Sequence, residues 1–340
     1  MKIASPLLRL VPVLLVLVGC VPRPEVDVVA YVSVDEEFAG PILAAFDRRT
    51  DGETGVVPRF DAESTKTVGL VNRIFAERDR PTCDVFWNNE PLHAVRLQRA
   101  GMLATRDWDL PADYPPDMVA ADGSWCGFAA RARVLIVNTK RLPDPADWPR
   151  RVEELADPKW GDRCAMARPV FGTTATHFAV LAARRGVDDA ETFLDAVIGN
   201  ARVYSGNKQV ALAVSGGAVD WGLTDTDDAI IERDGGYPVE IVFPDQSPAD
   251  AGTLRIPNTV MVLKDCPHPV AADLLADYLV TPETEDRLAM GNSSQIPIHR
   301  GSEFPPRVLP AEPVRWMRAD FPAAAEVWDD WIGRVAAKFD

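Results

Sequence analysis

Hydrophobic residues along the chain follow two alternating spacings, that of a β-strand and that of an α-helix. The run DVVAYV, which ends at Val32, is β-rich, and apolar residues then recur at helical spacing from Phe38 to Phe46. The runs VVPRF and CDVFW, which end at Phe60 and Trp87, are each followed by another helical pattern. Strand–helix units in series predict an α/β fold, with a mostly parallel sheet flanked by helices.

Two longer strand-like runs interrupt this series. GFAARARVLIVN covers residues 127–138, and LRIPNTVMVLK covers residues 254–264. Between them the runs RCAMARPV, ARVYS and VDWGL each lead into a helical pattern, which makes a second α/β series. We therefore predict two lobes with crossing strands as their hinge: lobe 1 is residues 27–137 plus 254–300, and lobe 2 is residues 138–253 plus 301–340.

The start of the chain has the pattern of an export signal. Lys2 and Arg9 precede an apolar segment, residues 10–18, that is too short to span a bilayer. The segment ends in LVGC, which resembles the lipobox of bacterial lipoproteins, so we expect a signal peptide over residues 1–19 and a lipid anchor on Cys20. Residues 20–26, which contain two prolines, are then a short stiff tether. A plain signal peptide is the alternative.

Composition excludes some classes of function. The chain has 340 residues, 47% of them hydrophobic and 26% charged, which is ordinary for a folded protein. Its net charge of −15, without a basic stripe, argues against a nucleic-acid partner.

Export also changes how the remaining cysteines are interpreted. Cys83, Cys126, Cys164 and Cys266 have no zinc-site spacing, so in an oxidising compartment they are either buried thiols or disulfide partners. Among the pairings we favour Cys126–Cys266, because the strands that they flank are expected to run antiparallel as neighbours.

Polar clusters stand where the predicted strands end and the predicted helices begin. In open α/β sheets, ligands bind beyond the carboxyl ends of the strands. If the two lobes face each other, the clusters of both converge on one cleft. They are Ser33-Val34-Asp35, Asn88-Asn89-Glu90, Gly172-Thr173-Thr174, Ser205-Gly206-Asn207 and Thr224 to Asp228.

Two of the candidate features suit an anion. In Gly172-Thr173-Thr174 the glycine lets a ligand approach the backbone, and hydroxyls and free N–H groups at a helix start donate to negative charge. The alternative is that Thr173 only caps its helix. Arg131 and Arg133 alternate on a crossing strand and so point to one face, where they hold either an anionic ligand or a surface ion pair.

The stretch Asp225-Thr226-Asp227 suits a cation. Capping explains one or two of these residues, because carboxylates are favourable in a first helical turn. The surplus suits a hard metal ion, which prefers oxygen ligands, or an ammonium group on a substrate. Glu90, at a strand end in the other lobe, is the expected partner across the cleft.

These segments together resemble the solute-binding proteins of bacterial ABC importers, and among them the ferric-iron-binding group. The resemblance extends over nearly the whole mature chain. It rests on the segments YVSVDEEFAGPILAAFDRRTDG, DVFWNNEP, GFAARARVLIVNT, DPKWGDRCAMARPVFGTT, SGNKQVALAVSGGAVDWGLTDTDDA and HPVAADLLADYLVTPET. It implies a two-lobed, type II periplasmic-binding-protein fold. It also implies a monomer that captures a small ligand and delivers it to a permease and ATPase complex in the inner membrane.

The resemblance also assigns residues to the ligand. The loop from Ser33 to Asp35 contributes a ligand group, the loop at Glu90 contributes a carboxylate, and the Gly172 turn and Asn207 hold a synergistic anion. Iron binders of the group carry adjacent tyrosines after the strand that here reads VDWGL, whereas this chain has Asp225-Thr226-Asp227.

Several functions stay open at this stage. No obligatory cofactor is expected, and ferric iron bound by Glu90, Asp225, Asp227 and an anion is chemically sound, since carboxylates are hard oxygen donors. A phosphorylated or phosphonate solute is the alternative ligand. A hydrolase with Glu90 or Asp227 as general base has no supporting motif. A ligand-sensing lipoprotein is a third possibility.

Overall fold

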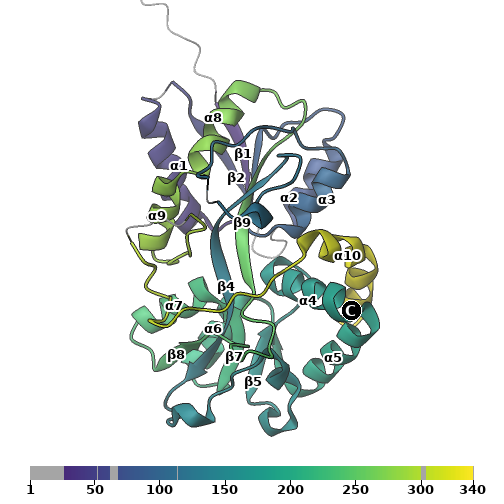
Figure 1. Ribbon diagram of the computed structural model, residues 1–340, viewed down its shortest axis with the longest axis vertical. Helices are drawn as coiled ribbons and strands as arrows, with labels where there is room; N and C mark the ends of the chain where they lie inside the picture. Colours follow the sequence, from purple (N-terminus) through teal and green to yellow (C-terminus); the bar gives the residue numbers. More distant parts are fainter. Residues whose placement is uncertain (1–26, 52, 62–67, 113, 300–303, 340) are drawn as a thin grey trace, which may run out of the picture.

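A single mixed sheet organises the molecule from end to end. The computed structural model describes residues 27–340 except 52, 62–67, 113, 300–303 and 340. The strand order is β2-β1-β3-β9-β4-β7-β5-β6, and β8 also pairs with β4. In Figure 1, the two halves of this sheet lie one above the other, each with helices on its sides.

The upper half contains three parallel strands. β1 (Val28–Val32) pairs in parallel with β2 (Val56–Phe60) and with β3 (Val85–Asn88). All of β3 and nearly all of β1 is buried, as expected for strands covered by helices on both faces.

The lower half repeats the arrangement. β5 (Cys164–Ala167) pairs in parallel with β6 (Arg202–Tyr204) and with β7 (Trp221–Asp225). β8 (Val239–Val242) is antiparallel to β4. The carboxyl ends of β5, β6 and β7 therefore meet at one edge of this half, as the carboxyl ends of β1 and β3 do in the upper half.

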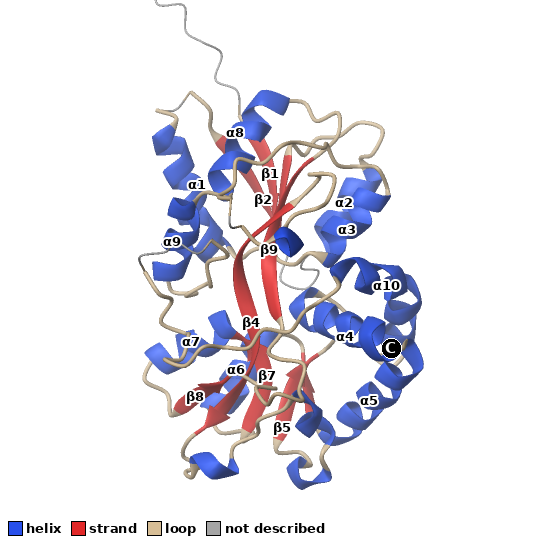
Figure 2. Cartoon of the chain, in the orientation of Figure 1, coloured by secondary structure: helices blue, strands red, loops and turns tan. Residues whose placement is uncertain are grey.

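Two long antiparallel strands connect the halves. β4 (Cys126–Asn138) pairs with β9 (Arg255–Val262) through Ala132, and from Arg133 onward it pairs with β7. Figure 2 shows β4 and β9 side by side between the two groups of strands. The sequence prediction of two crossing strands is therefore confirmed. The lobe boundaries themselves stay a prediction.

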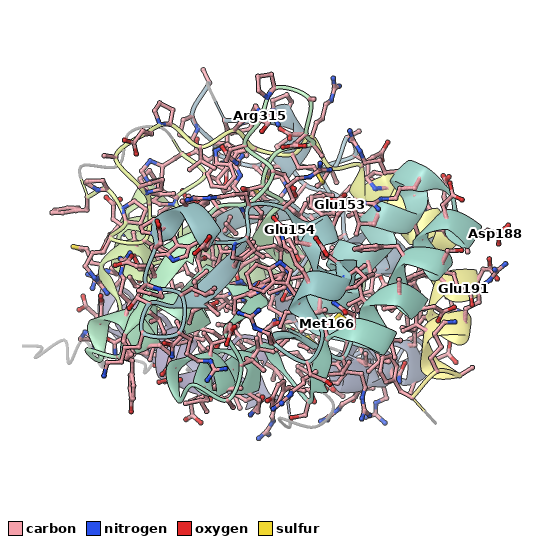
Figure 3. The ribbon with its side chains drawn as sticks, turned by 90° about the horizontal axis from the view of Figure 1, so that it is seen from below. Glu153, Glu154, Met166, Asp188, Glu191 and Arg315 are labelled. Carbon is pink, nitrogen blue, oxygen red and sulfur yellow. The ribbon has the colours of Figure 1, made fainter. Side chains whose placement is uncertain are left out.

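Helices α1 to α7 lie between the strands, as the alternating pattern predicted, and α8 to α10 follow the last strand. Their bounds are α1 (Glu36–Arg49), α2 (Val68–Ala76), α3 (Leu92–Arg99), α4 (Gly172–Arg185), α5 (Val187–Asn200), α6 (Asn207–Ser215), α7 (Thr226–Asp234), α8 (Pro269–Leu279), α9 (Pro282–Met290) and α10 (Phe321–Ala336). The last helix packs against α4. It is also tied to α5, because Asp188 and Glu191 each lie 2.9 Å from Arg334. Figure 3 labels these two acids near the edge of the molecule.

The cysteine pairing inferred from the sequence is wrong. Cys83, Cys126, Cys164 and Cys266 are all buried and free. The strands do run antiparallel, but Cys126 lies opposite Val260, and Cys266 follows beyond the end of β9. Because a strand advances about 3.3 Å per residue, six residues of chain separate the two thiols too widely for a bridge.

The export signal cannot be described from the structure. Cys20 and residues 1–26, on which the signal peptide, the lipid anchor and the tether depend, lie outside the described residues. Among the residues that the structure describes, no helix is both long enough and apolar enough to cross a membrane.

Candidate functional site

A cavity of ≈ 440 Å³ lies where the strand ends of the two halves meet. Its upper wall comes from the loops after β1 and β3, and its lower wall comes from the segments after β5, β6 and β7. The upper wall consists of Ser33, Val34, Asp35, Phe38 and Asn89, with Arg131 of β4 between the walls. The lower wall consists of Ala167, Arg168, Phe171, Gly172, Thr173, Thr174, Ser205, Gly206, Asn207, Lys208, Gln209, Asp225, Asp227 and Asp228.

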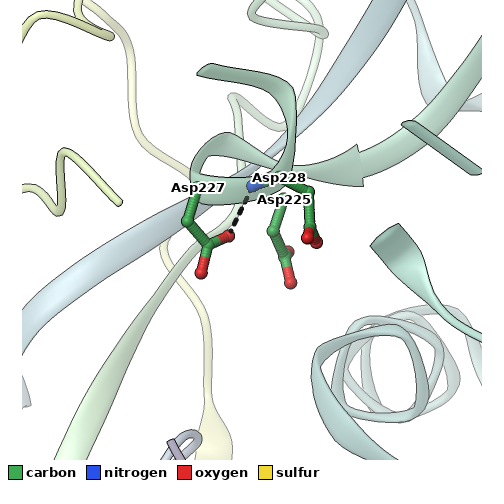
Figure 4. Close-up of side chains that lie close together, drawn as sticks. All are labelled: Asp225, Asp227 and Asp228. Atoms are coloured by element: carbon green, nitrogen blue, oxygen red, sulfur yellow. Dashed lines mark hydrogen bonds between the residues drawn. The ribbon is translucent and has the colours of Figure 1, made fainter. Parts of the chain in front are cut away.

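Three carboxylates converge on the lower wall. Asp225, Asp227 and Asp228 each offer an oxygen, and these oxygens lie within 4.8 Å of one another. Figure 4 shows the three side chains leaving the turn between β7 and α7 toward the same side. Since hard cations prefer carboxylate oxygens, this group has the chemistry of a metal site.

Asp225 is already engaged within the protein. Its carboxylate accepts hydrogen bonds from Arg133 at 2.6 Å, from Thr173 at 2.5 Å and from Asn207 at 3.0 Å. Arg133 is fully buried, and Asp225 is only 4% exposed. Because both partners are buried, the pair is held strongly, since loss of either one leaves a buried charge without its counterion. Asp225 therefore anchors the lower wall and has one charge already balanced.

The surroundings of Asp227 disfavour its ionised form. Burial raises its pKa to about 7, the nearby Arg131 guanidinium opposes that rise, and the carboxylates of Asp225 and Asp35 add to it. Arg131 lies 3.9 Å away, at the edge of ion-pair distance. A cation bound at this point would favour the ionised carboxylate and remove the excess charge.

The start of α4 differs from the expected threonine cap. The N-cap residue is Phe171, and the hydroxyl of Thr173 bonds Asp225 instead of its own helix. Thr174 donates to Asn207 at 3.0 Å and accepts from Arg133 at 3.2 Å. The hydroxyls therefore hold the wall together. Gly172 has φ of +62°, a conformation that favours glycine, although a side chain there would find open space.

Four helices begin at the cavity, and the starts of α4 and α6 suit an anion best, because at α7 the N–H of Asp228 already donates to Asp227 at 3.1 Å. In α1, α4, α6 and α7, no N-cap side chain accepts a hydrogen bond from the first turn. Free N–H groups and the positive end of the helix dipole favour negative charge. Ser33 does not cap α1, since the N-cap residue of this helix is Asp35.

Arg131 joins the two walls. It donates a hydrogen bond to the carbonyl of Asn89 on the upper wall, and it approaches Asp227 on the lower wall. Both Arg131 and Arg133 are buried. The interpretation of these arginines as surface ion pairs is therefore wrong, and their expected placement on one face of β4 is confirmed.

On the upper wall, Ser33 is prepared for a ligand. Its hydroxyl is buried, lines the cavity and has no hydrogen-bond partner within the described part of the chain. A buried hydroxyl without a partner costs free energy unless something else satisfies it. Asp35 lines the same wall.

Glu90 and Asn88 are turned away from the cavity, contrary to the expectation that they contact the ligand. Glu90 accepts bonds from Asn88, from the backbone N–H groups of Leu92 and His93 at the start of α3, and from Thr176 of α4 at 2.9 Å. It therefore caps α3 and connects the two walls, and it is not brought to the carboxylate group. Thr226 is likewise buried below the cavity, where its hydroxyl accepts from the N–H of Ala132.

The sequence reasoning missed several groups that line the cavity. Arg168 follows β5, and Lys208 follows Asn207 in the first turn of α6. Asn89 and Asp228 belong to polar clusters that the sequence predicts at the cleft, but the prediction assigned their neighbours, not these two residues, to the ligand. Lys208 and Arg168 could have been named from the sequence, because both follow predicted strand ends. Only the fold shows which residues of each cluster point into the cavity.

Comparison with known families gives one broad match. The family described as bacterial extracellular solute-binding protein matches residues 88–323. This span contains the crossing strand β4 and the whole lower wall.

Two similar proteins have names that concern iron. Iron uptake protein A2 of Synechocystis sp. is 26% identical over 266 residues, which is 72% of this chain and 70% of that protein. The Fe(3+)-binding periplasmic protein of Serratia marcescens is 30% identical over 154 residues, which is 45% of each chain. The second similarity thus covers less than half of either protein.

Solved structures confirm the fold. Iron-bound HitA from Pseudomonas aeruginosa has a TM-score of 0.78 and 24% identity, and it covers 92% of this chain and 99% of its own. Apo ferric ion-binding protein A of Pasteurella haemolytica has a TM-score of 0.80 and 19% identity, with coverages of 92% and 98%. The predicted α/β, type II periplasmic-binding-protein fold is therefore confirmed.

Proposed function

We propose that this chain, which belongs to the bacterial extracellular solute-binding protein family, binds ferric iron together with a small anion and delivers it to an ABC importer. The observation that carries the proposal is the joint presence of a carboxylate group and several free helix starts in one cavity. The first suits a hard trivalent cation, and the second suits an anion that completes its coordination.

Asp227 and Asp228 are the proposed metal ligands. Asp225 stands beside them, but its oxygens already accept hydrogen bonds from Arg133, Thr173 and Asn207. The carboxylates thus take the place that the tyrosines hold in the ferric-iron-binding group. Two carboxylates leave most positions around the iron open, so an anion with several oxygens is needed to fill them.

The anion would lie against the starts of α4 and α6. Lys208 and Arg168 line this part of the cavity and add positive charge. Gly172, Thr173, Thr174 and Asn207 form the floor, and they act through backbone N–H groups more than through the hydroxyls that they already use. A polycarboxylate such as citrate, or carbonate, has the required charge and oxygen donors.

The mode of action follows from the two walls. A ligand that contacts Ser33 or Asp35 above and Asp227 below binds the closed form best and shifts the population toward it. In this proposal, residues 27–137 with 254–300 and residues 138–253 with 301–340 move as the two lobes. We further propose export, a lipid anchor at Cys20, a monomeric state, and a permease and ATPase complex as the receiver.

The direct test is ligand discrimination by the purified protein. Ferric citrate, ferric iron with carbonate, inorganic phosphate and an aminophosphonate are compared by thermal shift and native mass spectrometry. A ligand that binds only the folded state stabilises it by mass action. We expect a large shift and a bound mass with iron plus anion. A shift with the aminophosphonate alone would make the solute a phosphonate.

A matched pair of variants locates the binding. The double variant Asp227→Asn, Asp228→Asn keeps the shape of the wall but removes two charges, and it is expected to lose the iron-dependent shift. Asp189→Asn, on an exposed turn of α5, is the control and is expected to keep it. Retention of full iron binding by the double variant would show that these carboxylates are not the ligands.

A further inference from the structure

The crossing strand β4 contains one irregularity, directly before Arg131. Its pairing with β9 shifts between Phe128, opposite Asn258, and Ala130, opposite Pro257, so that Ala129 is an extra residue. Ala129 has φ of +37°, which is unusual for a residue with a side chain. This is a β-bulge, a feature that re-aims the side chains that follow it.

Side chains on β9 and α9 satisfy the backbone of the bulged residue. The N–H of Ala129 donates to the carboxylate of Glu285 at 2.5 Å, and its carbonyl accepts from the side-chain amide of Asn258. A bulged residue loses its ladder partners, so these bonds replace those that a regular strand would make. Ala130 then pairs with Ile296 in both directions at 2.7 Å.

Glu285 is placed to hold this geometry. It is 0% exposed on α9, and besides Ala129 it accepts from the N–H of Ile298 at 3.0 Å and from the N–H of His299 at 2.9 Å. Together these backbone donors reach both oxygens of the carboxylate. A buried carboxylate in such a setting is retained only because its donors are arranged to satisfy both oxygens.

The bulge decides which way the arginines point. Side chains alternate along a strand, so one extra residue exchanges the two faces for everything that follows it. Without Ala129, Arg131 and Arg133 would leave the cavity face of the sheet. With it, Arg131 bonds the carbonyl of Asn89, and Arg133 bonds Asp225.

We propose that Glu285 is a positioning residue for the ligand site, which acts by fixing the bulge at Ala129 and thereby the direction of Arg131. Glu285 itself is not among the residues that line the cavity, and it reaches the backbone of β4 from α9. Its effect on the ligand rests on the proposed function, whereas its effect on the strand does not.

The first test uses the protein without ligand. Glu285→Gln keeps the size of the side chain but places an NH₂ group against one of the backbone N–H groups, which leaves a buried donor unpaired. Hydrogen exchange measured at a temperature where the variant is fully folded is expected to be about 10-fold faster in the peptide spanning residues 126–133. The exposed neighbour variant Glu283→Gln is the control and leaves exchange unchanged.

The outcome separates positioning from general stability. Faster exchange confined to residues 126–133 supports the proposal. Uniform acceleration across the molecule, or none in this peptide, overturns it. If Glu285→Gln does not fold, as judged by circular dichroism, Asn258→Ala removes the other support of the bulge and carries the same expectation.

The second test concerns affinity. Since a partner that orients a contacting group commonly changes affinity by about 10- to 100-fold, ferric citrate is expected to bind Glu285→Gln at least about 10-fold more weakly than the wild type. An unchanged affinity alongside altered exchange in β4 would refute the link to the ligand. If the wild type binds no ferric citrate, the proposed function has failed, and the exchange experiment still decides the role of Glu285.

Discussion

The two walls of the cavity are built differently. The lower wall contains the carboxylates of Asp225, Asp227 and Asp228 and the starts of α4, α6 and α7. The upper wall contributes the start of α1, the unpaired hydroxyl of Ser33 and the carboxylate of Asp35. Its other acid, Glu90, is turned away from the cavity.

This difference indicates a division of tasks. The lower wall is preorganised by buried bonds such as that between Arg133 and Asp225, so it can hold charged groups before the ligand arrives. The upper wall has fewer charged groups, and under the proposed mode of action it contributes by closing on a ligand that the lower wall already holds. The following variants test the comparison, from the largest expected effect to the smallest.

Asp225→Asn is expected to have the largest effect on stability. It leaves the fully buried Arg133 without its counterion, and breaking a buried pair costs about 3–5 kcal/mol of unfolding free energy. Urea unfolding followed by circular dichroism measures this loss of unfolding free energy, with Asp189→Asn as control. A loss similar to that of the control would show that the lower wall is not held by this pair.

Asp227→Asn is expected to weaken binding of ferric citrate more than Asp35→Asn. A hydrogen bond or contact to a charged group is worth about 1.5–3 kcal/mol, so Asp227→Asn reduces affinity about 10- to 100-fold. Asp35→Asn, on the wall that closes later, reduces it less than about threefold. Titration calorimetry compares the two variants. Equal losses would contradict the assignment of charge to the lower wall.

Asp227 is also expected to shape the pH dependence of the ligand-free protein. Its pKa is raised from 3.8 to about 7, so the folded state binds a proton there that the unfolded state has lost. The wild type therefore loses unfolding free energy as the pH rises from about 4 to about 7.

Asp227→Asn removes this contribution, and the comparison of the two proteins isolates it. Asp245, whose pKa burial also raises to about 7, titrates in both. The difference in melting temperature, variant minus wild type, is expected to become more positive as the pH rises from 4 to 8. A constant difference across this range would mean that Asp227 is ionised throughout.

Ser33→Ala is expected to have the smallest effect. The hydroxyl has no partner in the ligand-free protein, so its removal leaves the melting temperature unchanged or slightly higher. Loss of one neutral hydrogen bond to the ligand weakens binding by about 2- to 10-fold. A clear loss of stability would show that Ser33 supports the upper wall itself, contrary to the proposed contact with the ligand.

Much of the fold was predictable from local pattern. Strand and helix spacings alone predict the α/β series, and the long runs around residues 127–138 and 254–264 predict the crossing strands, because such patterns reflect burial along one element. The positions of the candidate clusters followed from the rule that ligands bind beyond strand ends, and most of them line the cavity.

The tertiary structure decided what each residue does at those positions. Asp225 and Asp227 stand two residues apart in one turn, yet their arginine partners differ. Asp225 accepts a 2.6 Å hydrogen bond from Arg133, which is 92 positions away in the chain, whereas Asp227 lies 3.9 Å from Arg131. Glu90 is turned away from the cavity because the start of α3 and Thr176 of α4 both offer hydrogen-bond donors to it. Such partners are distant in sequence, and no local pattern contains them.

The sequence by itself therefore determined the elements, their order and the edge of the sheet at which the cavity lies, since these depend on neighbours along the chain. The direction of Arg131 depends instead on one extra residue in β4 and on a carboxylate from α9 that fixes it. Ala129 and Glu285 are 156 positions apart in the chain. Only the folded chain brings them together, because the contact depends on the packing of the whole upper half.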